Sequence, residues 1–263
     1  MFNCSVIRSF CWSKGVAIGA SALLLTTAPA LCGLGVITSA VAQTKGAPTI
    51  APCKTIDINR YEAAIEQFEK RDAERPPSPD ATLFVGSSTF TKWASLEADL
   101  AAVHAVNRGF GGATIGEINH FAPRYVTAFR PKRIVFYAGT NDIGELHHSG
   151  AMVAHDFEQF ADFVEGKLPG TEIYFVSMSV APSRLSFEKD FVEGNRLIAD
   201  FCKHTAHMHY IDVTPVMRDS SGRLRGELFG FDRLHMNRAG YELWIPVLKE
   251  ALKKRVVVGF ERK

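Results

Sequence analysis

Short apolar runs alternate with longer amphipathic segments along residues 81–254. The runs are rich in β-branched and aromatic residues and predict strands at residues 81–85, 104–107, 133–137, 172–177 and 208–213. The longer segments repeat apolar residues at helical spacing and predict helices at residues 115–129, 153–168, 187–204 and 238–254. Apolar strands that alternate with amphipathic helices are typical of a parallel sheet covered on both faces. We therefore predict a three-layer α/β/α sandwich with about five parallel strands.

The chain before the first strand divides into three parts. Residues 1–42 contain two basic residues and then an uncharged apolar stretch that closes with Ala-Val-Ala, the pattern of a signal peptide and its cleavage site. An uncleaved membrane anchor is the alternative, because the stretch approaches spanning length. Residues 43–56 predict a flexible tether, and residues 57–71 an amphipathic helix that opens a domain over 57–263. We expect a protein exported to the periplasm or beyond, membrane-anchored if the leader is uncleaved.

The net charge of the chain argues against two classes of partner. The chain carries 30 Lys and Arg residues against 28 Asp and Glu residues, and Arg8 and Lys14 leave with the predicted leader. The remaining chain then has 28 residues of each sign and no formal net charge. This balance argues against nucleic acid or an anionic membrane surface as the main partner. After leader cleavage we expect no stable membrane insertion.

Two cysteines, Cys53 and Cys202, remain once the leader is removed. In an exported protein, two thiols favour a disulfide, which here would tie the N-terminal arm to the domain. Two separate, reduced and partly buried cysteines are the alternative. Both stay open, because sequence alone does not bring two sulfur atoms together.

Four stretches carry chemistry at the ends of predicted strands or just before the last helix. Ser88 follows the first strand, where a hydroxyl faces a cleft near the positive end of a helix dipole. The glycine-rich residues 109–114 follow the second strand and can direct backbone N–H groups at a ligand. Asn141 follows the third strand and can donate to a developing oxyanion. Asp232, three residues before His235, can orient an imidazole that accepts a serine proton.

Each stretch alone has an ordinary structural explanation. A serine at such a turn is often a helix N-cap, Asn-Asp is common turn chemistry, and Asp-x-x-His also forms surface turns or metal pairs. The glycine stretch lacks both a following Gly-Lys-Ser/Thr and the spacing of a dinucleotide fingerprint. Ligands of open α/β sheets lie at the carboxyl ends of the strands. The combination of stretches in this order therefore indicates one site.

The combination resembles the SGNH, or GDSL-type, hydrolase family across nearly all of residues 81–255. Residues 84–88 are similar to the family's first block, 109–114 to its second, 139–142 to its third and 232–235 to its fifth. The resemblance implies a flavodoxin-like SGNH hydrolase fold and a serine esterase that needs no metal or organic cofactor. Ser87 departs from the pattern, because the family usually has Asp there. We expect this to alter the stability of the loop, with Ser87 as the alternative nucleophile.

The resemblance also implies a role for each matching residue. Ser88 matches the nucleophile, and Asp232 and His235 match the rest of its catalytic triad. Gly112 and Asn141 match the oxyanion donors, with the N–H of Ser88 as a third. The implied reaction is hydrolysis of a carboxylic ester, in a small molecule or on a polymer, through an acyl-enzyme. A short acyl group on a carbohydrate or cell-envelope polymer is the expected substrate.

Alternative functions remain open from the sequence. The same triad would serve an acyltransferase acting on a cell-envelope polymer, and a silent carbohydrate-binding domain would bind without turnover. A metal enzyme would draw ligands from one of two sets, His204, His207 and His209, or His147, His148, His155 and Asp156. We interpret both sets as solvated surface, because neither lies at a strand's carboxyl end. Specificity is expected in the loops 143–150 and 181–189. Arg184 in the second loop either lies near the cleft or is a solvated loop residue, and we favour the solvated position.

Overall fold

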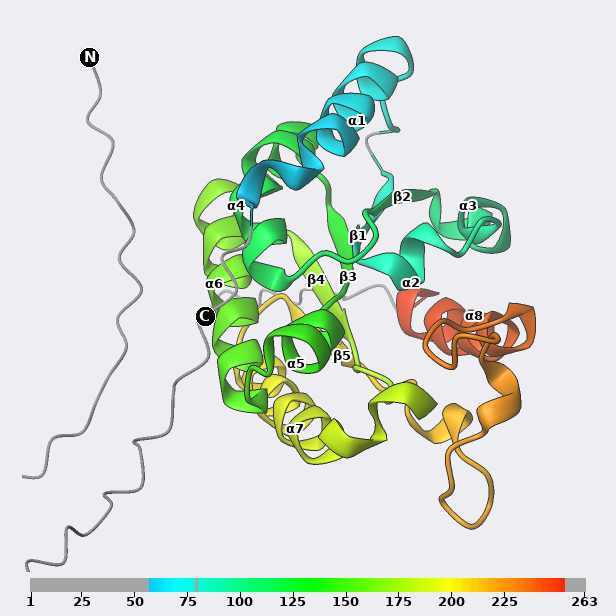
Figure 1. Ribbon diagram of the computed structural model, residues 1–263. Helices are drawn as coiled ribbons and strands as arrows, with labels where there is room; N and C mark the ends of the chain where they lie inside the picture. Colours follow the sequence, from blue (N-terminus) through cyan, green and yellow to red (C-terminus); the bar gives the residue numbers. More distant parts are fainter. Residues whose placement is uncertain (1–56, 79, 254–263) are drawn as a thin grey trace, which may run out of the picture. The chain divides into compact units, whose positions relative to one another are not determined.

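A computed structural model describes residues 57–78 and 80–253, and within these residues five strands form one parallel sheet (Figure 1). Its order is β2-β1-β3-β4-β5, and all four neighbouring pairs run parallel. The strands are β1 (Thr82–Gly86), β2 (Ala105–Gly109), β3 (Arg133–Tyr137), β4 (Glu172–Val176) and β5 (Met208–Ile211). The predicted leader, 1–42, and tether, 43–56, lie outside the described residues.

Helices cover both faces of the sheet because alternate strand residues enter two different cores. In β3, Ile134 and Phe136 belong to one apolar cluster, whereas Val135 and Tyr137 belong to the other. The first cluster is closed by α1 (Glu62–Glu74), α4 (Ile115–Tyr125), α5 (Thr140–Leu146), α6 (Gly150–Lys167) and α7 (Glu188–His204). The second is closed by α2 (Ser88–Thr91), α3 (Leu96–Asp99) and α8 (Arg238–Lys253). Figure 1 shows α6 and α8 on opposite sides of the strands. The predicted three-layer α/β/α fold is confirmed.

The predicted element bounds differ from the observed ones by a few residues. The second strand starts one residue late because His104 has left-handed backbone, with φ of 49°. Part of the segment predicted as a loop at 143–150 is helical, because it includes the end of α5 and the first residue of α6. The connections also contain short 3-10 helices: η1 (Ile58–Tyr61), η2 (Ala101–Val103), η3 (Thr127–Phe129), η4 (Pro182–Phe187), η5 (Pro215–Met217) and η6 (Gly226–Leu228).

The N-terminal helix α1 docks on the sheet through a buried ion pair. Arg108 of β2 is fully buried, and its Nη2 donates to Oδ1 of Asp72 on α1 at 2.5 Å. The rings of Phe68 and Phe129 lie 5.4 and 4.9 Å from the guanidinium carbon of Arg108. A buried guanidinium is costly without an anionic partner and aromatic faces around it. Helix α1 is therefore an integral part of the fold.

Two sequence predictions concern the membrane and the cysteines. Within residues 57–78 and 80–253, no helix combines the length and the hydropathy that crossing a bilayer requires. Cys202 lies buried on α7, and this burial raises the pKa of its thiol to about 12. Its predicted partner, Cys53, lies outside the described residues, so the disulfide stays a prediction.

The strand order fixes where a ligand site can form. From β1 the chain proceeds to β2 on one side, and then returns to β3 on the other side of β1. The crossovers therefore diverge between β1 and β3 and leave a crevice at the carboxyl ends of these two strands. Ser88 comes two residues after β1 ends, and Asn141 comes four residues after β3 ends.

Candidate active site

Three of the predicted residues form a hydrogen-bonded series. The Oγ of Ser88 lies 3.0 Å from Nε2 of His235. The Nδ1 of the same ring lies 2.7 Å from Oδ2 of Asp232. Ser88 starts the short helix α2, while Asp232 and His235 lie in the loop before α8. The structure thus brings together groups that are 147 residues apart in the sequence.

A tight turn holds Asp232 and His235 in register. The Oδ1 of Asp232 accepts from the N–H groups of Leu234 and His235, each at 3.0 Å. The N–H of Gly230 donates to the carbonyl of His235, and Arg233 has left-handed backbone with φ of 54°. The imidazole and both N–H groups hold the pKa of Asp232 well below its ordinary value. Asp232 is therefore ionised at neutral pH and can stabilise a protonated imidazole.

The neighbouring serine, Ser87, is in a different environment. Its side chain is fully buried, and its hydroxyl has no hydrogen-bond partner among the described residues. Its backbone carbonyl accepts from the N–H groups of Phe90 and Thr91 in α2. Ser88, by contrast, is partly exposed and lines the cleft. The geometry favours Ser88 over Ser87 as the reactive hydroxyl.

The predicted oxyanion donors face the same cleft as Ser88. Within the described part of the chain, the N–H groups of Ser88 and Gly112 have no backbone acceptor. Gly112 adopts φ of +81°, a conformation that favours glycine. The Nδ2 of Asn141 donates to the carbonyl of Ala113 at 2.9 Å, which uses one of its two hydrogens. The other remains for a ligand.

Arg184 orients the amide of Asn141, and the prediction that it is a solvated loop residue is wrong. Only 6% of Arg184 is exposed, because η4 places the side chain against α5. Its Nη2 donates to Oδ1 of Asn141 at 3.2 Å and to Glu145 at 2.8 Å, and its Nη1 donates to the carbonyl of Thr140. Since a guanidinium only donates, the oxygen of Asn141 must face it and the NH₂ must face the cleft. Gly144 makes room, because a Cβ there would lie 2.5 Å from Nε of Arg184.

The segment before α1 closes the glycine-rich loop from outside. The hydroxyl of Tyr61 donates to the carbonyl of Gly111 at 2.8 Å, and Nη2 of Arg60 donates to that of Gly112 at 3.2 Å. Arg60 also binds both oxygens of Glu117, the buried carboxylate whose capping box with Thr114 starts α4. Sequence analysis did not assign Arg60 and Tyr61 to the site. Helical spacing predicts which face of a helix is buried, but it does not predict which segment of the chain that face contacts.

The cleft beside Ser88 has a volume of about 590 Å³, which is in the range of small-molecule sites. It lies over Ser88, Gly112, Asn141 and His235. Its remaining lining is mostly polar and charged, and consists of Asp57, Arg60, Lys92, Gly111, Thr114, Glu145, Leu146, Arg184 and Leu234. The loops expected to set specificity contribute Glu145, Leu146 and Arg184.

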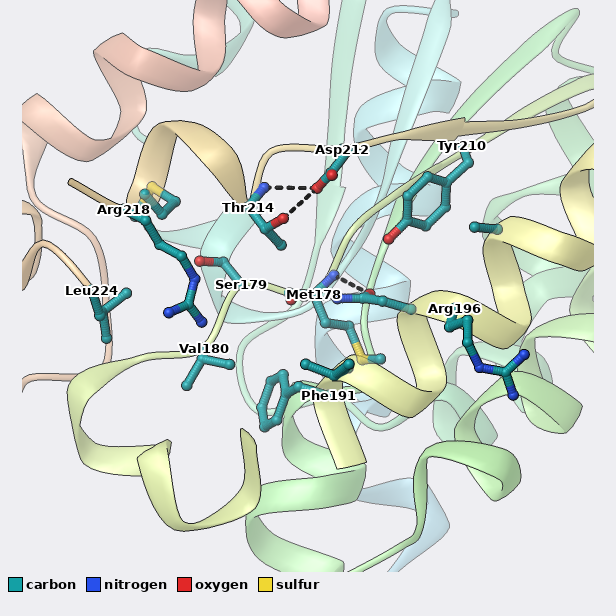
Figure 2. A pocket seen from close by; sticks show the side chains of 14 residues that line it. Met178, Ser179, Val180, Phe191, Arg196, Tyr210, Asp212, Thr214, Arg218 and Leu224 are labelled. Carbon is teal, nitrogen blue, oxygen red and sulfur yellow. Dashed lines mark hydrogen bonds between the residues drawn. The ribbon is translucent and has the colours of Figure 1, made fainter. Parts of the chain in front are cut away.

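A second pocket of about 250 Å³ lies at the carboxyl ends of β4 and β5, against α7 (Figure 2). In this view Asp212 and Thr214 lie on one side and Phe191 on the other. Oδ1 of Asp212 accepts from the N–H of Thr214 at 2.9 Å and from its hydroxyl at 2.6 Å. Ser179 and Phe191 also line a narrow hollow at Ser88, so the pocket adjoins the cleft region.

The histidines considered as metal ligands have two different environments. In the first set, His207 and His209 are half-buried and both contact the carboxylate of Glu172, at 2.9 and 2.5 Å, so the interpretation as solvated surface is wrong for them. His204 is exposed. In the second set, His147 and His155 are exposed, whereas His148 and Asp156 are half-buried beside the buried Asp142, so the interpretation as solvated surface is wrong for these two as well.

Asp142 gives a prediction for the pH dependence of stability. Burial, together with the neighbouring carboxylate of Asp156, raises the pKa of Asp142 from 3.8 to about 7, against the opposing N–H of Ile115. Between these values the folded protein holds a proton that the unfolded chain has lost, so stability falls as pH rises. In chelator-containing buffer, the free energy of unfolding should fall by about 4 kcal/mol more in the wild type than in Asp142→Asn. Denaturant unfolding across this pH range measures the difference, and parallel profiles would contradict the raised pKa.

The series of serine, imidazole and carboxylate lies at the carboxyl ends of β1 and β3, where the crossovers diverge, beside backbone N–H groups without a backbone acceptor among the described residues. This is the arrangement that a serine hydrolase site requires. The model of the GDSL-like Lipase/Acylhydrolase family matches residues 79–243, which is more than half of the chain. The chain therefore belongs to this family. No curated protein matches it.

Solved structures of the same fold share little sequence with this chain. A GDSL-like lipase from Bacteroides thetaiotaomicron is 16% identical with a TM-score of 0.62, and the match covers 73% of this chain and 98% of that one. A lipase/acylhydrolase from Enterococcus faecalis is 18% identical with a TM-score of 0.52, and the match covers 66% of this chain and 95% of that one. An acetylxylan esterase from Geobacillus stearothermophilus is 14% identical with a TM-score of 0.55, and the match covers 68% of this chain and 96% of that one. At these identities the likeness shows a shared fold.

Proposed function

We propose that this protein is an exported serine esterase that hydrolyses carboxylic esters with short acyl groups. The observation that carries the proposal is the series from Ser88 Oγ to His235 Nε2 at 3.0 Å and from His235 Nδ1 to Asp232 at 2.7 Å. Export is supported by the leader pattern of residues 1–42. The family and its fold are compatible with many esters, so the acyl length and the alcohol rest on the lining of the cleft.

The proposed reaction runs through an acyl-enzyme. His235 accepts the proton of Ser88 as the serine oxygen attacks the ester carbonyl, and Asp232 stabilises the imidazolium that forms. When the tetrahedral intermediate collapses, the C–O bond to the alcohol breaks and His235 returns the proton to the departing oxygen. Water then attacks the acyl-serine with His235 again as base, and the acid and the free hydroxyl of Ser88 are released.

Negative charge on the carbonyl oxygen is the main barrier that the site must lower. Ser88, Gly112 and Asn141 line the cleft in which that charge would form. The two backbone N–H groups have no backbone acceptor among the described residues, and the Asn141 amide has a second hydrogen to donate. Arg60 and Tyr61 fix the carbonyls of the glycine-rich loop, and Arg184 fixes the amide of Asn141. Donors held in this way need no reorganisation during the reaction.

The cleft lining supports a short acyl group. Leu146 and Leu234 are the two aliphatic side chains among its residues, and the rest are glycine or polar. A long acyl chain gains about 0.8 kcal/mol for each methylene that leaves water, and in this cleft those two leucines are the aliphatic side chains that could provide that gain. The neighbouring pocket combines the hydrogen-bonding groups of Asp212 and Thr214 with the partly exposed ring of Tyr210. This combination supports a hydroxylated alcohol such as a carbohydrate.

A series of p-nitrophenyl esters tests the acyl preference. We expect kcat/KM for the acetate to exceed that for the laurate by at least about 10-fold, because added methylenes find few apolar contacts. Acetylated xylan and acetylated peptidoglycan, assayed in parallel for free acetate, should separate hydrolysis from transfer to another acceptor. Hydrolysis should persist in a strong chelator and stop with a serine-directed phosphonate. A preference for laurate would overturn the short-acyl proposal and leave the serine mechanism standing.

A further inference from the structure

A group of potential metal ligands lies behind the proposed oxyanion amide, outside the proposed triad. Asp142 on α5, His148 between α5 and α6, and Asp156 on α6 each offer one ligand atom, and these atoms lie within 4.8 Å of one another. Within residues 57–78 and 80–253, no other group of three or more His, Cys, Asp or Glu side chains has its ligand atoms this close together. Asp142 is 1% exposed, whereas His148 and Asp156 are half-buried.

The protein groups around this cluster leave its charge unbalanced. Within the described part of the chain, no Lys or Arg forms an ion pair with Asp142 or Asp156. Asp142 is almost fully buried and Asp156 is half-buried, so neither carboxyl group is fully solvated by bulk water. The Nδ1 of His148 is buried without a hydrogen-bond partner among the described residues. Two carboxyl groups and an imidazole with an unpartnered nitrogen therefore lie close together, where a cation would satisfy them.

We propose that Asp142, His148 and Asp156 bind a divalent transition-metal ion, with Zn²⁺ as the best match. One imidazole and two carboxylates are ligands that zinc accepts, and three protein ligands leave further positions for water. Mg²⁺ and Ca²⁺ are hard cations that prefer oxygen ligands, so an imidazole nitrogen fits them less well. Binding requires the ligand atoms, now within 4.8 Å of one another, to move closer together, and rotation of the His148 side chain about its own bonds would bring the ring in.

The surrounding contacts already orient the ligands, as outer-shell contacts do in metal sites. Oxygens of Asp142 accept from the N–H of Ile115 at 3.1 and 3.3 Å, at the start of α4. The N–H of His148 donates to the carbonyl of Asp142 at 3.0 Å, and Nδ2 of Asn119 donates to the carbonyl of Asp156 at 3.0 Å. A bound ion would join α4, α5 and α6 directly behind Asn141. Its role is structural, and it takes no part in the ester chemistry.

Thermal unfolding of the full-length protein with zinc chloride tests the proposal. After chelator treatment and dialysis, zinc at about 100 times its Kd should raise Tm by about 5 to 10 °C, with one ion bound per chain by calorimetry. His148→Ala and Asp156→Asn should each lower zinc affinity at least about 10-fold. His155→Ala is the matched control, because this exposed imidazole neighbours Asp156 and should leave the shift unchanged.

Three results would overturn the site. One is a wild-type protein whose Tm does not change with zinc, which needs no variant to interpret. Another is an undiminished shift in both His148→Ala and Asp156→Asn, with circular dichroism confirming that these variants fold. The third is a shift lost in His155→Ala and kept in His148→Ala, which would assign the zinc to surface histidines. None of these readouts depends on ester hydrolysis.

Discussion

Replacement of Ser88 by alanine is expected to reduce kcat for p-nitrophenyl acetate by about 10⁴-fold or more while the fold stays intact. The variant loses the oxygen that His235 would activate at 3.0 Å, and no acyl-enzyme can form. Residual hydrolysis would come from binding and the remaining oxyanion donors alone. Steady-state kinetics measure the loss, and labelling by a serine-directed phosphonate, followed by mass spectrometry, should disappear with it.

Ser87→Ala is the matched control, one residue away. Its hydroxyl is fully buried without a partner among the described residues, so its removal leaves no other group unsatisfied. We expect kcat within about threefold of the wild type and a free energy of unfolding that is unchanged or slightly higher. The reverse pattern, with activity kept in Ser88→Ala and lost in Ser87→Ala, would assign the nucleophile to Ser87.

The parts of the site that the sequence predicted are those set by local chain geometry. Asp232 and His235 are three residues apart in a turn that closes on itself, so their contact needs no distant information. Ser88 and Asn141 follow apolar strands that are recognisable by composition, and parallel strands end at a common edge. The fold followed from the same alternation of apolar strands and amphipathic helices, as the two cores on either side of β3 show.

The parts that the sequence did not predict depend on contacts between distant segments. Arg184 and Asn141 are 43 residues apart, and Tyr61 and Gly111 are 50 apart. No sequence pattern indicates that a loop arginine is buried under a neighbouring helix. A helical period predicts the buried face of a helix but not the segment that this face contacts. The grouping of Asp142 with His148 and Asp156 likewise follows from how α5 packs on α6.

The oxyanion contribution of Asn141 is expected to be large. Asn141→Ala should reduce kcat for p-nitrophenyl acetate about 10²- to 10³-fold with little change in KM, because the donor acts on charge that develops after binding. Asn141→Asp separates donation from packing, since it keeps the shape of the side chain and presents only acceptors when ionised. Its carboxylate would still accept from Arg184 but would lose the bond to the carbonyl of Ala113, so circular dichroism and thermal unfolding must accompany the kinetics to show that the variant folds. If Asn141→Asp retained wild-type kcat, or if both variants raised KM with kcat unchanged, the amide would serve substrate binding and the negative charge would be stabilised by the backbone donors alone.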